Sequence, residues 1–486
     1  MRIFLLVGVA LMTLGAKAPK SLPSAQPMTA SDKSTGAKAH PQILQEFGGL
    51  YEGPQAGYVR GVGQKIALQS GLSNAGGDFT VSLLNTPVNN AFAIPGGYVY
   101  VTRQLMGLMN NEAELASVLG HEVGHVAARH GQKRSSRATK GGLLAAGATI
   151  LGAVLGGGQG AELGQQLGGQ LATRWVLGYS RAQEYEADDL GVSYLAKSGY
   201  DPMAASTMLA SLAAQTALDT RVQGVQEKSI PAWASTHPDP ASRVARAAAK
   251  ASASNPVGKT QNSDAFYAAL DGILYDDDPK QGVVEGLTFR HPDLKIAFTA
   301  PVGYVMSNGT TAVTISGSGG QGQFSGGPYS GDLNTYVASV FKAFGDSQKV
   351  ALTPGSVERT TINGLQAAHA SAQVAGQSGV MVITVYAYEF AGNQAFHFLT
   401  LTPSTSSSAF NSLYQSVRRM SAQEAAAVKP RRIDVVTVKG GDTIEKFAAR
   451  MAYDSFKTER FTVLNALKAG TPLKSGQKVK IVVYGN

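Results

Sequence analysis

The spacing of apolar residues predicts helices in the first half of the chain. Apolar positions recur with a helical period over 111–125, and Asn110 or Asn111 can cap the start of this helix. A second, shorter helical pattern covers 180–189. These segments indicate helices in the first half of the chain.

Farther along the chain the apolar period changes from helical to alternating. A linker is predicted at 251–263, followed by a helix and a turn over 264–280. Within 286–403, β-branched and aromatic residues predict strands at 294–298, 312–315, 380–386 and 395–400. Helical patterns lie near 332–344 and 405–421. The segment 264–425 is therefore expected to form a mixed or antiparallel α+β domain, and the whole chain a multidomain α+β protein.

The last segment, 430–486, has a pattern of its own. It predicts a strand, two helices and a final strand. Asp442 or Thr443 can cap the first of these helices, and Gly476 lies in the turn before the last strand. A small βααβ module is expected here.

The N-terminus resembles a secretory signal. Met1 and Arg2 precede an apolar run over 3–15, and small residues at 16–18 resemble a cleavage site. A signal peptide over 1–18 is therefore predicted, with an uncleaved membrane anchor as the alternative. Residues 19–39 are rich in Ser, Pro, Lys and Ala and predict a flexible linker.

A second apolar run covers 141–161 and is long enough to cross a bilayer. It is rich in glycine, however, and it separates two segments that carry candidate site residues. We therefore favour a buried or lid-like helical hairpin over the cleft. Docking on an anionic membrane surface and a true membrane span are the two alternatives.

Composition narrows the classes of protein further. A chain of 486 residues predicts two to four domains. It contains no cysteine, so disulfides and cysteine-protease chemistry are excluded. The net charge is +9, and residues 429–486 hold 12 Lys and Arg against 5 Asp and Glu. Such a basic segment suits an anionic cell-wall polymer or membrane surface. Nucleic acid is not expected, because no platform of basic and aromatic residues is present.

The strongest chemical signal is the sequence His-Glu-Val-Gly-His at 121–125. His121 and His125 are four residues apart, so on a helix both imidazoles lie on one face and can bind one metal ion. Glu122 flanks this pair and is placed to act as the general base for water. The spacing predicts two ligands and the base of a zinc peptidase.

The third ligand is expected in the second helical pattern. Glu184 and Asp188 are again four residues apart, so Glu184 can bind the metal while Asp188 accepts the free ring N–H of a ligating histidine. Two histidines and one glutamate leave a coordination position open for water, which is typical of a catalytic zinc site. Gly131 stands where a metzincin has its third histidine, so that class is excluded.

Other polar residues near these motifs are predicted to have no chemical role. His130, Glu186 and Asp189 are expected to be solvated surface residues. The acidic run 276–278 lacks the spacing of a calcium loop and predicts a solvated turn. The remaining scattered histidines are expected to be structural, namely His291, His369 and His397.

These motifs resemble a known family. The segment 121–125, with Ser-Arg-Ala-Gln-Glu-Tyr-Glu-Ala-Asp at 180–188, is similar to the gluzincins of peptidase family M forty-eight. This family includes the CAAX prenyl endopeptidases and the proteases of HtpX and BepA type. Asn-Ala-Phe-Ala-Ile-Pro-Gly-Gly at 90–97 and Thr-His-Pro at 236–238, followed by Arg243, resemble further elements of the family.

The resemblance implies a mainly helical metalloprotease domain with a small edge-strand sheet over residues 40–255. It also implies roles for residues outside the first two motifs. The strand containing Asn90, Ala91, Phe92 and Ala93 is expected to pair with the extended substrate backbone. His237 is expected near the zinc, where it either stabilises the oxyanion or occupies the open position and keeps the enzyme latent. Arg243 is expected to assist at the oxyanion.

Two weaker resemblances concern the later domains. The segment 264–425 is faintly similar to PsbP/Mog1-like modules. The segment 430–486 resembles a LysM module, a βααβ fold that binds N-acetylglucosamine-containing glycans such as peptidoglycan.

From these features we expect a zinc-dependent endopeptidase with one Zn²⁺ per chain, located in the periplasm or cell envelope. Its expected substrates are misfolded or stalled envelope proteins, including outer-membrane proteins. Two alternatives remain. One is a latent protease that acts chiefly as a chaperone-like scaffold, and the other is a peptidoglycan hydrolase.

Overall fold

The computed structural model describes the greater part of the chain, namely residues 27–72, 75–133, 179–223, 237, 240–348, 350–376, 379–391, 393–468 and 470–485. The predicted signal peptide and the apolar run 141–161 lie outside these ranges. In the part of the chain that is described, no helix is long and apolar enough to span a membrane.

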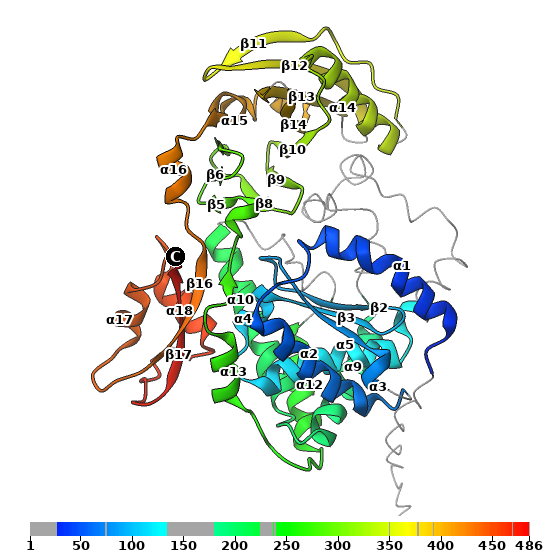
Figure 1. The fold of residues 1–486 in the computed structure, drawn as a ribbon, viewed down its shortest axis with the longest axis vertical. Coiled ribbons are helices and arrows are strands. Elements are labelled where there is room, and N and C mark those ends of the chain that lie inside the picture. The colour runs from blue at the N-terminus through cyan, green and yellow to red at the C-terminus, as the bar shows by residue number, and fades with distance from the viewer. Residues whose placement is uncertain are drawn as a thin grey trace, which may run out of the picture.

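A small sheet and a layer of helices form the first domain (Figure 1). The sheet has the order β1-β3-β2, with β1 (Thr80–Leu84) parallel and β2 (Ala91–Ile94) antiparallel to β3 (Tyr98–Thr102). One face packs against helices in the main core, and the other face carries Phe92 and Tyr100 in a separate small cluster. The helices are α2 (Pro54–Ala67), α4 (Arg103–Leu108), α5 (Glu112–Ala127), α9 (Arg181–Lys197), α10 (Ala204–Gln223) and α12 (Pro240–Ser252).

Close contact between α5 and α9 brings the two predicted motifs together. Asn111 caps α5, because its side chain accepts from the backbone N–H of Glu114 at 2.9 Å. Gly124 faces α9, and a β-carbon there would lie only 3.1 Å from the carbonyl oxygen of Ala187. The glycine therefore permits a separation that a larger residue would prevent.

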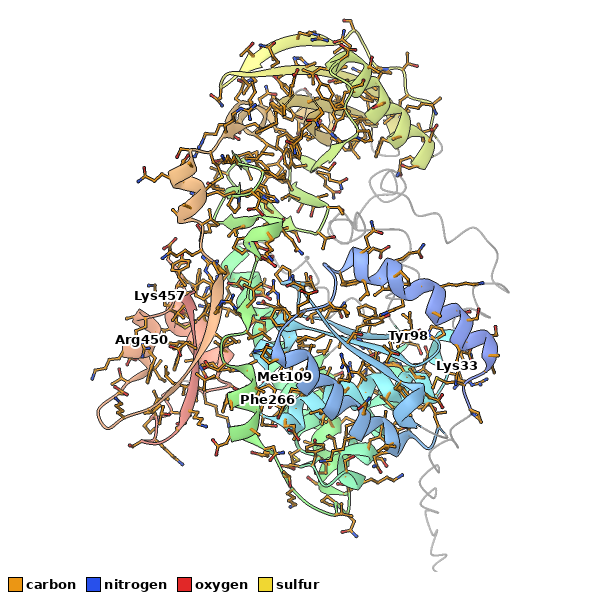
Figure 2. The ribbon with its side chains drawn as sticks, viewed as in Figure 1. Lys33, Tyr98, Met109, Phe266, Arg450 and Lys457 are labelled. Atoms are coloured by element: carbon orange, nitrogen blue, oxygen red, sulfur yellow. The ribbon has the colours of Figure 1, made fainter. Side chains whose placement is uncertain are left out.

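The prediction of a flexible linker over 19–39 is wrong for residues 30–39, which are helical. Helix α1 (Ala30–Glu46) starts with a capping box at Thr29 and covers the outer face of the sheet. Its His40 Nδ1 lies 2.7 Å from the hydroxyl of Tyr100. A side chain at Gly36 would collide with Tyr98, so the helix lies directly on the sheet. Figure 2 shows Lys33 and Tyr98 on this side of the molecule.

The second domain confirms the predicted alternation of strands. Its seven-stranded antiparallel sheet has the order β11-β12-β13-β14-β10-β9-β8, and a four-stranded sheet has the order β15-β7-β6-β5. Helix α14 (Leu333–Gln348) packs against one face of the larger sheet. The strands are β5 (Val283–Glu285), β6 (Thr288–His291), β7 (Ile296–Thr299), β8 (Val305–Asn308), β9 (Ala312–Gly317), β10 (Gly320–Gly327), β11 (Glu358–Ile362), β12 (Leu365–Gly376), β13 (Gly379–Ala391), β14 (Gln394–Pro403) and β15 (Arg418–Arg419). Two short helices flank β15 in the chain, α15 (Asn411–Ser416) before it and α16 (Ala422–Ala427) after it.

The C-terminal module has the predicted order of strand, helix, helix and strand. It consists of β16 (Arg431–Thr437), α17 (Ile444–Ala449), α18 (Lys457–Leu464) and β17 (Lys478–Tyr484). The module is not a separate unit, because Phe461 and Ile481 belong to the same core as the helices of the first domain. The segment between the predicted domains also joins this core, through α13 (Ser263–Leu270) and β4 (Leu274–Tyr275), which pairs with β16.

A buried lysine marks this junction. Lys480 of β17 has no exposed surface, and its Nζ donates to the carbonyl oxygens of Gly107, Leu108 and Met109 at 2.8, 3.1 and 2.6 Å. These carbonyls lie at the C-terminal end of α4, just before α5. Burial lowers the pKa of Lys480 to about 7. The module thus contacts the segment from which the histidine-bearing helix begins.

The acidic run 276–278 is not the solvated turn that the sequence suggested. Asp276 accepts from Gln104 Nε2 at 3.1 Å and from the Tyr453 hydroxyl at 2.7 Å. Asp277 accepts from the backbone N–H of Val284, and burial raises the pKa of its carboxyl to about 7. The run therefore forms a polar junction between the domains, which the local sequence did not reveal.

Candidate metal centre

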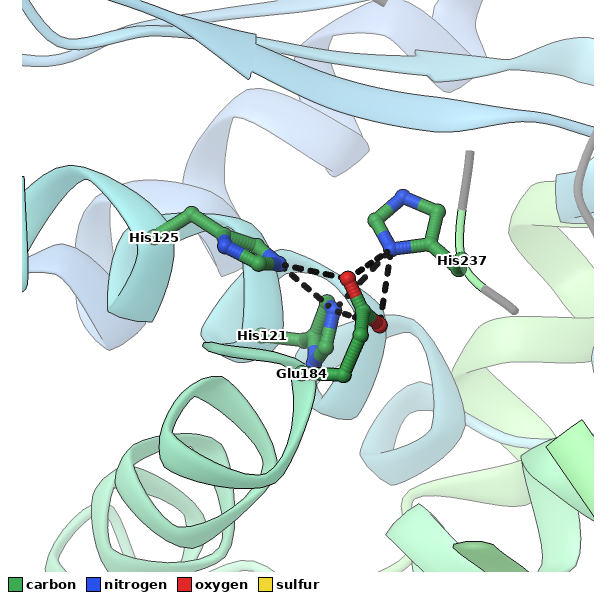
Figure 3. A group of neighbouring side chains, drawn as sticks. All are labelled: His121, His125, Glu184 and His237. Atoms are coloured by element: carbon green, nitrogen blue, oxygen red, sulfur yellow. Dashed lines mark hydrogen bonds and ion pairs between the residues drawn. The ribbon is translucent and has the colours of Figure 1, made fainter. Parts of the chain in front are cut away.

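Four side chains from three segments meet beneath the sheet (Figure 3). His121 and His125 project from α5, Glu184 from the first turn of α9, and His237 from the segment before α12. All four are buried, and one ligand atom from each lies within 4.8 Å of the others. The structure therefore brings together the three predicted metal ligands and His237.

The spacing of these atoms fits one tetrahedral ion. The Nε2 atoms of His121 and His125 are 3.0 Å apart, and each lies 3.5 Å from a carboxylate oxygen of Glu184. The Nδ1 of His237 lies 3.3 Å from His121 Nε2 and 3.1 Å from Glu184 Oε2. Ligands bonded to one tetrahedral zinc at about 2.0–2.1 Å are separated by roughly 3.3 Å. Two imidazoles and a carboxylate are also a typical zinc donor set.

The outer nitrogen of His121 has the predicted partner. Asp188 Oδ1 lies 3.0 Å from His121 Nδ1. Burial favours a higher pKa for the Asp188 carboxyl, but hydrogen bonds from Arg243 and His121 hold that pKa well below its usual range. Asp188 is therefore a carboxylate that fixes the ring orientation of His121.

Arg243 lies behind these carboxylates rather than facing open space. Its Nε and Nη2 donate to the two oxygens of Asp188 at 2.8 and 2.6 Å, and its Nη1 lies 2.7 Å from Glu184 Oε2. Only 1% of its surface is exposed. This geometry supports positioning of the two acids, and it differs from the oxyanion contact that the resemblance implied for Arg243.

A second chain of contacts, missed at the sequence level, supports His125. Its Nδ1 lies 2.8 Å from His130 Nδ1, and His130 Nε2 lies 3.1 Å from Glu186 Oε2. His130 is fully buried and Glu186 is half-buried, so the expectation that both are solvated is wrong. Spacing could not reveal this contact, because α5 ends at Ala127 and the turn after it carries His130 back toward His125. Asp189, also expected to be solvated, forms an ion pair with Arg246 at 2.8 Å.

Glu122 lies beside the ligands and is fully buried. Its Oε1 is 3.5 Å from His237 Nε2, and neither carboxylate oxygen has a hydrogen-bond partner among the described residues. Burial raises the pKa of this carboxyl. An unpartnered buried carboxylate with a raised pKa has the properties of a general base.

The predicted substrate strand forms the edge of the small sheet nearest the site. Ala91 and Ala93 face the helices, Phe92 faces α1, and Asn90 is hydrogen-bonded to Thr102. The Nε2 of His237 lies 3.2 Å from the carbonyl oxygen of Ala91. At the other end of the strand, the ring of Tyr179 stacks on His125 with centroids 3.9 Å apart.

Comparison with known proteins agrees with this geometry. Residues 54–251 match the model of Peptidase family M48. The chain contains a peptidase domain of this family. The matched segment holds the five residues His121, Glu122, His125, Glu184 and His237.

Curated relatives of this peptidase domain come from bacteria and from mitochondria. The beta-barrel assembly-enhancing protease of Escherichia coli is 31% identical over 281 residues, which are 54% of each chain. The mitochondrial metalloendopeptidase OMA1 of Schizosaccharomyces pombe is 29% identical over 44% of this chain and 59% of its own. The chain thus spans about half the length of the curated relatives it matches.

A solved structure also aligns with part of this chain. The cyanobacterial PsbP of Synechocystis aligns with 28% of this chain and 98% of its own, at 13% identity and a TM-score of 0.24.

Proposed function

We propose that this chain is a zinc-dependent endopeptidase of the bacterial cell envelope that cleaves misfolded or stalled envelope proteins. The observation that carries the proposal is the convergence of His121, His125 and Glu184 beside the buried carboxylate of Glu122. The peptidase family and the names of the relatives support the reaction class. The predicted signal peptide and the name beta-barrel assembly-enhancing protease support the location and the substrates.

The donor set favours zinc over harder cations. Magnesium and calcium prefer oxygen ligands, whereas two imidazoles and one carboxylate are typical of catalytic zinc. Zinc, when bound, acts as a Lewis acid that polarises a peptide carbonyl and makes water acidic enough to ionise near neutral pH. His121, His125 and Glu184 would hold it.

The chain's own residues supply proton transfer and positioning. Glu122 takes the proton of the attacking water and passes it to the leaving amine, and its raised pKa brings it closer to the working pH. Asp188 holds His121, while Arg243 holds both Asp188 and Glu184. The substrate backbone pairs with β2, the edge strand, and so presents its carbonyl to the metal.

One observation favours a latent state of the same enzyme. His237 lies within hydrogen-bonding distance of both the metal ligands and the Ala91 carbonyl, which are two places that substrate must use. A peptide could bind only after this imidazole moves. In this latent state the chain would not cleave its clients.

The C-terminal module is proposed to hold the enzyme at the envelope. Basic residues such as Arg450 and Lys457 lie on the side of the module that faces away from the peptidase domain (Figure 2). This charge suits peptidoglycan-associated anionic polymers or an anionic membrane surface.

The experiment that tests the proposal compares the wild type with Glu122→Gln on unfolded casein and measures zinc in both proteins. Cleavage by the wild type alone, with about one zinc in each protein, is the expected result. Equal cleavage by both would show that the activity does not arise at this site. Release of muropeptides from purified cell wall, without proteolysis, would point instead to a peptidoglycan hydrolase.

A further inference from the structure

A polar cavity of about 320 Å³ lies where three parts of the molecule meet. Helix α10 forms one wall, the C-terminal module forms another, and the segment leading into β2 forms a third. Its volume lies within the range of sites for small ligands or a few side chains. The residues that line the cavity include Asn89, Gln215, Asp219, Tyr453 and Arg460.

The cavity lies in line with the edge strand β2. Pro87, Val88 and Asn89 line it and lead directly into Asn90 and Ala91. Two residues span at most about 7 Å, so Asn89 lies within that distance of Ala91, whose carbonyl contacts His237. An extended peptide that pairs with β2 and passes the metal centre therefore reaches this cavity next.

The opposite end of β2 offers little room. Ala93 and Ile94 line a small pocket that is also bounded by Met28, Asp32 and Tyr179, and its free volume is about 30 Å³. That volume holds roughly one water molecule. The N-terminal segment is held there by Arg129, whose Nη2 lies 3.8 Å from Asp32 Oδ2. Among the described residues, the space beside the strand is small at this end and larger at the other.

The chemistry of the spacious end matches a polypeptide. The guanidinium of Arg460 lies over the Tyr453 ring, 4.2 Å from its centroid, and its Nε is buried without a hydrogen-bond partner among the described residues. Asp219 accepts from Gln215 Nε2 at 2.7 Å, which leaves its second oxygen free to accept. The side-chain oxygen of Asn89 has no partner either. Donors and acceptors together suit peptide N–H and C=O groups, and Arg460 suits a carboxylate.

We propose that this cavity binds the substrate chain on one side of the scissile bond, with Arg460 recognising a carboxylate or carbonyl of that chain. The proposal rests on the proposed peptidase function. It makes the C-terminal module part of the substrate-binding surface, because Tyr453 and Arg460 come from that module. We expect the binding of a peptide here to be asymmetric, because among the described residues the cavity side of the cleft offers the larger space.

The test uses a peptide that the wild type cleaves, shortened in steps from each end. Each peptide is measured with the wild type, with Arg460→Met and with Lys468→Met, the last being an exposed basic residue of the same module outside the cavity. Lengthening the peptide on one side should lower the KM of the wild type roughly tenfold, and lengthening it on the other side should not. Arg460→Met should lose that gain in KM, with zinc content unchanged. Lys468→Met should behave as the wild type.

A second experiment measures peptide binding without cleavage, so that it tests the cavity independently of the peptidase activity. Labelled peptides of both lengths are titrated into Glu122→Gln and into Glu122→Gln combined with Arg460→Met or with Asp219→Asn. Weaker binding of the long peptide by both double variants supports the cavity even if no cleavage is observed. Asp219→Asn keeps the shape of the wall from α10, so it guards against a folding defect of Arg460→Met. Equal affinity for long and short peptides in all variants would overturn the proposal.

Discussion

The Nε2 atom of His237 lies 3.2 Å from the carbonyl oxygen of Ala91, while its Nδ1 atom lies 3.1 Å from Glu184 Oε2. One imidazole thus connects the edge strand of the sheet to the carboxylate that we propose binds the metal. A substrate that pairs with β2 requires the Ala91 carbonyl, and a water that attacks it requires a free position beside Glu184. Both requirements are met only when His237 leaves.

His237→Ala is therefore expected to raise proteolysis of unfolded protein. The variant frees the Ala91 carbonyl and one coordination position, while His121, His125 and Glu184 remain to hold the metal. We expect an increase of several-fold in kcat/KM on casein, with zinc content unchanged. The measurement is initial rates at equal zinc loading.

A lower rate for His237→Ala would assign a different role to this residue. A fall in kcat with unchanged KM would show that His237 stabilises the oxyanion in the transition state. His237→Gln serves as the companion variant, because its amide can still donate to a developing oxyanion. If His237 is a latch, both substitutions should raise the rate.

Glu122→Gln is expected to abolish cleavage and leave the metal in place. The amide cannot take a proton from water, and loss of a general base costs roughly 100- to 10,000-fold in rate. Glu122 is not one of the four ligand-bearing residues, so zinc content should remain near that of the wild type. Metal analysis beside the casein assay checks both parts, and loss of zinc would reassign Glu122 to the ligand set.

The sequence predicted the grouping of these side chains because their spacing is local. Helical periodicity alone places His121 and His125 on one face of α5, and the same applies to Glu184 and Asp188 on α9. The alternation of the strands in the second domain is local information as well. In each case the pattern within one element determines which side chains share a face.

Contacts between distant segments could not be predicted in this way. His130 becomes buried because the chain turns after α5, and Glu186 reaches it from another helix. Lys480 looks like an ordinary exposed lysine of a strand, yet the carbonyls that it contacts lie more than 370 residues earlier in the chain. Such residues acquire their environment only from tertiary packing.

The contact between His125 and His130 leads to a prediction about metal affinity. His130 fixes the ring of His125 at 2.8 Å and is itself fixed by Glu186 at 3.1 Å. His130→Ala should weaken zinc binding about 10- to 100-fold, as is typical when a partner of a ligating histidine is lost. Competition with a chromogenic chelator measures this affinity directly.

Glu186→Gln is a milder change to the same series of contacts, which runs from His125 through His130 to Glu186. Its amide can keep a hydrogen bond to His130, so a smaller loss of zinc affinity is expected than for His130→Ala. Glu358→Gln, beside the half-buried His369 of the second domain, should leave zinc affinity unchanged. Wild-type zinc affinity in His130→Ala would show that His125 is held in place by its packing alone.

Asp277 links pH to the stability of the domain junction. Burial and the neighbouring Asp276 raise the pKa of its carboxyl to about 7 from an ordinary value of 3.8. Between these two values the folded protein binds more protons than the unfolded chain, so stability falls as the pH rises from about 4 to 7.

Asp277→Asn removes this dependence and keeps an acceptor for the Val284 N–H, whose hydrogen bond measures 2.8 Å. Urea unfolding should therefore show that the variant matches the wild type near pH 4 and exceeds it at pH 8, by at most about 4 kcal/mol. A constant difference between the two proteins across this range would contradict a buried, protonated Asp277.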